Sequence, residues 1–174
     1  MTLIRNRAKT LLSETPLPDY KHLPGKNARP DDGLLESIAH SASAVTDDAS
    51  YRSNAAWLYG IRLFNNGFYW EAHEVLEAVW NNAAPNSREK HLVQGVIQMA
   101  NAQLKASLKQ TKAADRLQKL AAECITRAYT GGNGNSGYGT NVGANLLLGL
   151  ESGQMHAAAA RCSQMDTALT LDLH

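Results

Sequence analysis

Helical spacing of apolar residues dominates this chain from about residue 32 almost to its end. No segment shows the alternation of apolar and polar residues that is typical of a β-strand. The spacing predicts helices over residues 32–44, about 50–66, 68–82, 88–109, 111–129, 142–151 and 153–166, the second of them capped by Asp47, Asp48 or Ser50. The chain is therefore expected to be all-α, a compact bundle of about five to seven helices.

Proline marks the N-terminal boundary of the helical region. Four of the five prolines lie in the first 30 residues. Because proline disfavours helix for itself and for the residue before it, residues 13–31 are expected to be extended, with anchors at Tyr20, His22 and Leu23. We divide the chain into an N-terminal arm (1–31) and one helical domain (32–174), whose motif core covers about 52–129.

Composition excludes several classes of partner. The 174 residues carry 17 basic and 16 acidic side chains, a net charge of +1, which gives no basic patch for nucleic acid or for an anionic membrane surface. There is no run of 18 apolar residues, and the first residues contain no apolar run long enough for a signal peptide, so none is expected. Cys124 and Cys162 have no metal-site or disulfide-framework spacing and are expected to be free thiols. A cytoplasmic location and an unidentified small-molecule or protein partner are the resulting expectations.

The segment from Gly67 to Trp80 is the richest in chemistry. Residues three, four and seven apart share a helix face, so His73, Glu77 and Trp80 form one stripe, with Tyr69, Trp70 and Leu76 beside it. Its aromatic character predicts that the stripe faces inward. Burying an imidazole and a carboxylate costs several kcal/mol unless they are hydrogen-bonded, paired or metal-bound, so the stripe is a candidate site.

The pair His73 and Glu77 allows two interpretations. The two side chains can bind one divalent metal ion or act as an acid–base pair, with Glu74 joining from the edge of the face. Alternatively, they hydrogen-bond to each other or to a neighbouring helix and fix its register. Glu71 lies on the far side of the helix and is expected to be solvated.

A second polar stripe follows on the next predicted helix. It is mostly amide rather than charged and comprises His91, Gln94, Gln98, Asn101 and Lys105. The turn at Pro85 should make the two helices antiparallel neighbours, so that Gln94 and Gln98 can meet the first stripe. A simple solvated face is the alternative. The glycine-rich segment 131–139 matches neither phosphate-binding fingerprint and is expected to be a surface loop.

Three blocks of this sequence resemble domain-of-unknown-function family 309. They are Trp57–Trp80, which contains the family's His-x-x-x-Glu-x-x-Trp pattern, then Leu92–Gln98, and the lead-in Pro18–Gly25. The resemblance implies a small all-α fold in a bacterial and archaeal family without an established activity, to which the label "predicted metal-dependent hydrolase" has been attached. The chain has Ala28-Arg29-Pro30 where the family pattern has Pro-His-Pro, so one potential ligand is missing.

Two functional hypotheses follow. The first is a metal-dependent hydrolase with His73, Glu77 and Glu74 as catalytic residues, His73 and Glu77 as metal ligands, and a pocket of Tyr69, Trp70, Trp80, Gln94 and Gln98. A catalytic zinc usually has three protein ligands, and Glu74 and His91 are the nearest candidates for a third. The second is a non-catalytic module for a small ligand or a protein, in which His73, Glu77, Gln94 and Gln98 form a structural polar network. The apolar residues of 142–166 can pack on a second subunit or on the domain itself.

Overall fold

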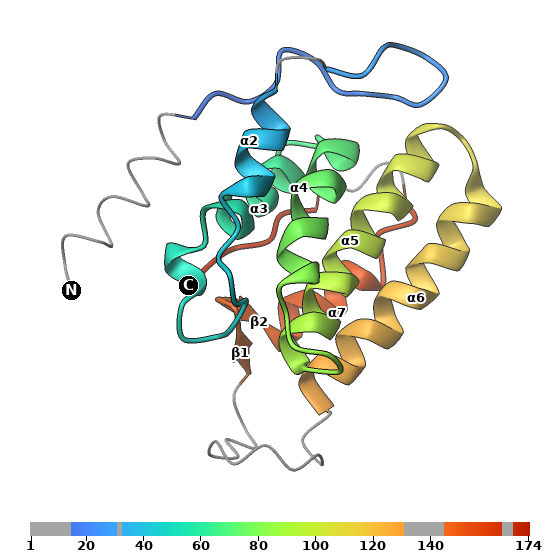
Figure 1. Ribbon diagram of the computed structural model, residues 1–174. Coiled ribbons are helices and arrows are strands. Elements are labelled where there is room, and N and C mark those ends of the chain that lie inside the picture. The colour runs from blue at the N-terminus through green and yellow to red at the C-terminus, as the bar shows by residue number, and fades with distance from the viewer. Residues whose placement is uncertain (1–14, 31–32, 131–144, 165–168) are drawn as a thin grey trace.

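The computed structural model describes residues 15–30, 33–130, 145–164 and 169–174. Its elements are α2 (Leu34–His40), a 3₁₀ turn η1 (Tyr51–Ser53), α3 (Ala55–Asn65), α4 (Tyr69–Asn81), α5 (Arg88–Ser107), α6 (Thr111–Thr130), β1 (Leu146–Leu147), β2 (Leu150–Glu151) and α7 (Ser152–Ala159). Helices dominate the described residues and pack closely (Figure 1), which confirms the all-α expectation.

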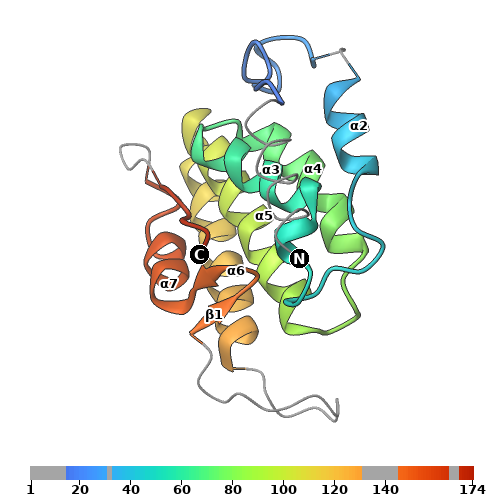
Figure 2. The ribbon, with the colours of Figure 1, turned by 90° about the vertical axis from the view of Figure 1, so that its left-hand side faces the viewer.

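The helices α3, α4 and α5 form the centre of the bundle. The long helices α5 and α6 run antiparallel beside each other, while α7 and α2 lie on opposite sides of the molecule (Figure 2). The core is aliphatic and aromatic, and its largest fully buried side chains include Trp57, Tyr59, Phe64, Leu76, Leu92, Met99 and Ile125. The helices α3, α4, α5 and α6 therefore each bury an apolar stripe.

Two helix boundaries are set by local residues. The side chain of Ser87 accepts a hydrogen bond from the Lys90 amide at 3.0 Å, so Ser87 caps the start of α5. Gly67 has a φ of 76°, a left-handed conformation that glycine adopts without steric cost, and it follows the end of α3. The resulting tight connection sets α3 and α4 against each other.

The residue that caps the start of α3 differs from the prediction. The helix begins after Asn54, whose side chain accepts from the Trp57 amide at 3.2 Å. The three residues predicted as caps serve the preceding loop instead: Asp47 accepts from the amide and hydroxyl of Ser50, and Asp48 accepts from the amide of Leu148. The sequence prediction was wrong because the 3₁₀ turn at residues 51–53 separates these residues from the helix.

A β-hairpin replaces the helix that was predicted over 142–151. The two strands pair antiparallel, and Leu148 and Gly149 form the turn with φ values of 47° and 79°. Two successive positive φ values are typical of a tight hairpin turn. The hairpin is held from the core because the indole N–H of Trp57 donates to the Leu148 carbonyl at 3.1 Å. Tertiary contacts therefore override the helical spacing of this apolar run.

The C-terminal helix is shorter than predicted. It ends at Ala159 rather than near residue 166, and part of that range, with the glycine-rich segment 131–139, lies outside the described residues. The side-chain amide of Asn65 donates to the carbonyl of Leu171 and accepts from its amide, so the last residues are bound to α3. No helix in the described ranges is long and apolar enough to cross a membrane.

Residues 15–30 of the arm contain no helix or strand, as expected, but they are not extended throughout, because residues 24–26 form a turn. The segment 21–28 is a closed loop, because the side chain of Asn27 accepts from the Leu23 amide at 2.7 Å and donates to the Lys21 carbonyl at 2.8 Å. The His22 ring contacts the Ala28 carbonyl through Nδ1 at 3.0 Å. Hydrogen bonds within residues 21–28 therefore hold this part of the arm as a compact loop.

Candidate functional site

The orientation of α4 differs from the prediction. Its inward face consists of small and aliphatic side chains that are completely buried: Ala72, Val75, Leu76 and Val79. The stripe predicted to face inward lies mostly on the outer side, where His73, Glu74 and Trp80 are partly exposed and Glu77 is exposed. The aliphatic stripe takes the core because the helix approaches α3 closely at Gly60, where a Cβ atom would lie 2.5 Å from Leu76 Cδ2.

The burial of Glu71 also differs from the prediction. It was expected to be solvated, yet its exposed fraction is 0%. Its Oε1 atom accepts a hydrogen bond from the His22 amide at 2.6 Å, while Oε2 is buried without a hydrogen-bond partner. Burial raises the pKa of this carboxyl; hydrogen bonds from the backbone of His22 and Glu71 and the charges of His22 and Lys21 oppose the shift. Glu71 is thus the most unusual acidic group of the helix.

The three predicted pocket aromatics contact three different neighbours. The Tyr69 ring packs edge-on against Phe64 of α3, with centroids 5.6 Å apart, and burial raises the pKa of its hydroxyl. Trp70 meets the arm, with its centroid 4.6 Å from that of His22.

Trp80 lies at the other end of α4, with the Lys90 ammonium 4.1 Å from its ring centroid. Its indole Nε1 is buried and has no acceptor among the described residues. Tyr69, Trp70 and Trp80 therefore do not form one continuous wall.

The polar stripe of α5 is partly exposed along its whole length. Within the described ranges, no hydrogen bond joins His73 or Glu77 to Gln94 or Gln98. Burial, and secondarily the charge of Arg127, lowers the pKa of His91, whose Nδ1 atom is buried and unpartnered. The stripe therefore leaves its amide groups free to bind other molecules.

The described side chains do not form a metal centre with three ligands. In the part of the chain that the structure describes, no three His, Cys, Asp or Glu residues lie close enough to hold an ion together. His73, Glu74 and Glu77 consequently do not form such a group, and His91 does not complete it. A catalytic zinc site needs about three protein ligands.

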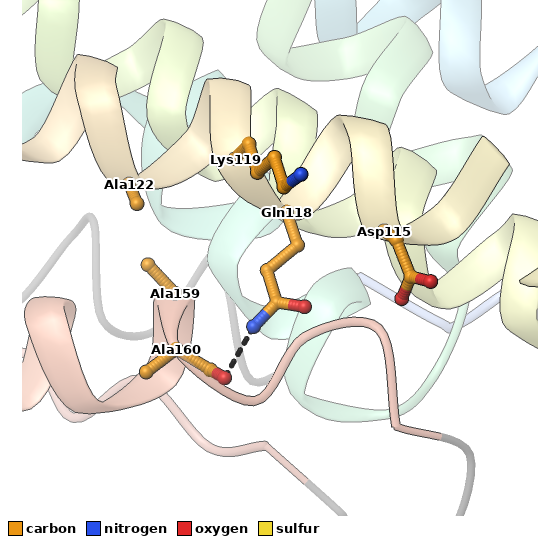
Figure 3. A pocket seen from close by; sticks show the side chains of 6 residues that line it. All are labelled: Asp115, Gln118, Lys119, Ala122, Ala159 and Ala160. Carbon is orange, nitrogen blue, oxygen red and sulfur yellow. Dashed lines mark hydrogen bonds between the residues drawn. The ribbon is translucent and has the colours of Figure 1, made fainter. Parts of the chain in front are cut away.

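The cavities lie away from the predicted residues. One of about 350 Å³ lies between α6 and the end of α7 and is lined by Asp115, Gln118, Lys119, Ala122, Ala159 and Ala160 (Figure 3). In it, the Gln118 amide donates to the Ala160 carbonyl. Another, of about 320 Å³, lies between α3 and residues 171–173. No motif in the sequence indicated either cavity.

Comparison with protein families gave one match. The family described as "Domain of unknown function (DUF309)" matches residues 57–117, which is about a third of the chain and includes all of α4 and α5. Neither the curated proteins nor the solved structures gave a match. Residues 57–117 of the chain are therefore similar to the DUF309 family.

Proposed function

We propose that this chain is a binding module and that its site is the polar face of α4 and α5. We define this polar face by the side chains His73, Glu74, Glu77, Trp80, Gln94 and Gln98. The observation that carries the proposal is that these side chains make no hydrogen bond within the described residues, although each has polar atoms that can donate or accept.

Buried polar side chains elsewhere in the fold provide a contrast. Asn54 caps α3, the Thr46 hydroxyl donates to the Val79 carbonyl at 2.8 Å, and Gln103 donates to the Gln164 carbonyl at 3.4 Å. The fold therefore pairs the polar groups that it needs for packing. The polar face is not part of this set and remains free for recognition.

The chemistry of the polar face suits a small polar ligand with both donors and acceptors. The glutamates accept hydrogen bonds, and the amides of Gln94 and Gln98 both donate and accept them. Lys90 holds the end of α4 by donating to the carbonyls of Trp80 and Ala83, at 3.0 and 3.2 Å, and adds a positive charge at that edge. Metal-dependent hydrolysis has less support, because the face lacks a third metal ligand.

A thermal-shift screen of small polar molecules tests the proposal. It compares wild type with the two variants His73→Ala and Gln98→Ala. The control variant is Gln110→Ala, which changes an exposed residue outside the polar face. A supporting ligand raises the melting temperature of wild type and of the control, and raises it less in both variants of the face.

Equal shifts in all four proteins would contradict the proposal. Elemental mass spectrometry on untagged protein adds an independent arm. Near-stoichiometric metal that is lost in both His73→Ala and Glu77→Ala would support the hydrolase instead.

A further inference from the structure

The arm contacts the beginning of α4 mainly through cations on aromatic rings. The Lys21 ammonium lies 5.3 Å from the ring centroid of Phe68, and the Arg29 guanidinium lies 5.2 Å from that of Trp70. The ring of His22 meets the same Trp70 edge-on. Both cations are exposed to water, which weakens their attraction to the rings, so the contacts are individually weak.

One buried hydrogen bond joins the loop 21–28 to α4, while residues 15–16 are held on α3 by Tyr59 and Arg62, which donate to the carbonyls of Pro16 and Thr15 at 2.6 Å each. The His22 amide donates to Glu71 Oε1, and His22 itself is only 7% exposed. The second carboxylate oxygen stays buried and unpartnered. A backbone amide is present in nearly every peptide and an aromatic ring in many, so the contact does not require that the occupant belong to the same chain.

Most of the docked arm remains in contact with water. Lys21, Lys26 and Arg29 are exposed, and Pro18 and His22 are the buried residues of the described arm. A segment held by few apolar contacts opens at a low free-energy cost. The loop closed by Asn27 can therefore leave α4 as a unit without disturbing the core.

Charge favours a basic occupant at this position. Within α4 there are three glutamates and no lysine or arginine, which gives a formal charge of −3. Arm residues 15–30 contain Lys21, Lys26 and Arg29 against Asp19, which gives +2. The arm is thus a basic segment bound to an acidic helix.

We propose that Phe68, Trp70 and Glu71, here called the arm site, form a binding site for a basic peptide segment of a partner protein, and that the arm occupies this site in the free chain. The expected partner segment carries a cation for each aromatic ring and a backbone amide for Glu71. Because the arm must leave first, it lowers the apparent affinity for the partner. This site is separate from the polar face and does not depend on the function proposed for it.

Fluorescence anisotropy with a labelled synthetic peptide of residues 18–30 tests the proposal on the full chain. Four proteins are compared. They are wild type, the arm variant Lys21→Ala/His22→Ala/Arg29→Ala, and two further proteins that combine the arm variant with either Trp70→Ala or Glu71→Gln. A control peptide carries Glu in place of Lys21 and Arg29. Melting temperatures establish that each protein is folded, since none of the substituted side chains belongs to the aliphatic core.

The peptide should bind the arm variant at least tenfold more tightly than wild type, and adding Trp70→Ala should weaken that binding at least tenfold. Glu71→Gln should weaken it less, because the amide oxygen still accepts the peptide N–H. Binding of the control peptide with equal affinity, no effect of Trp70→Ala, or no binding to the folded arm variant would overturn the proposal. Dimerisation of wild type through exchange of arms would show that the occupant is a second copy, and would overturn the assignment to a partner protein.

Discussion

The amide of His22 donates to the carboxylate of Glu71 across 49 residues of sequence, at 2.6 Å. This bond joins the arm to the first turn of α4, where the unpaired backbone N–H groups favour a negative charge. Burial acts in the opposite direction, since it disfavours the ionised carboxyl. The net result is a raised pKa, so burial outweighs the helix terminus and the arm cations.

Glu71 should make stability depend on pH in the direction opposite to that of an ordinary paired carboxylate. Its pKa in the folded chain lies above the unfolded value of 4.5, so the folded state holds the proton more tightly. The contribution of Glu71 is fully present below pH 4.5 and is lost as the pH rises through the folded pKa. Urea unfolding of wild type and Glu71→Gln between pH 4 and 8 should show the stability of wild type falling relative to the variant. A difference that stays constant or grows with pH would refute this account.

Two glycines close together in the sequence should respond oppositely to alanine. At Gly149 the φ is 79°, and a Cβ atom would lie 2.6 Å from Cε2 of the buried Tyr51, so Gly149→Ala should destabilise the fold by about 1–3 kcal/mol. At Gly153, in α7, no atom lies within 4 Å of the added Cβ, so Gly153→Ala should stabilise by up to about 1 kcal/mol. Urea unfolding at pH 7 measures both. Equal effects of the two substitutions would argue against the hairpin turn.

The two cysteines should be unreactive in the folded chain. Cys162 is completely buried, and burial raises its pKa to about 12; burial also raises the pKa of Cys124. Because the thiolate is the reactive form, iodoacetamide at pH 8 should leave both thiols unmodified in native protein and alkylate both in urea. Intact-mass spectrometry follows the reaction. Native alkylation of Cys162 as fast as in urea would contradict this packing.

The sequence predicted the central helices well because their apolar residues repeat at helical spacing and their caps are local. Ser87 caps the first turn of α5, and Gly67 directly follows the last turn of α3. The hairpin at Leu146–Glu151 could not be predicted in this way. Its turn requires a positive φ at Leu148, which leucine rarely adopts, and its anchor is Trp57, 91 residues away.

The site was predicted less well because two stripes compete on α4. The aromatic and ionisable stripe was predicted to face inward. The stripe that fills the core instead comprises Ala72, Val75, Leu76 and Val79. This aliphatic stripe continues back to Phe68 and passes beside Glu71, which was the available signal that Glu71 is buried. The role of His22 depends on a contact across 49 residues, and no local pattern encodes it.

The central claim is that the polar face serves binding rather than packing. It is tested by the stability of one combined variant, His73→Ala/Glu77→Ala/Gln94→Ala/Gln98→Ala. Substitutions at partly exposed positions outside the core usually change stability by about 0.5 kcal/mol or less, and alanine favours helix. Urea unfolding should therefore place the variant within about 1 kcal/mol of wild type, or above it. A loss of more than about 3 kcal/mol would show that the four side chains are a structural network and would contradict the account.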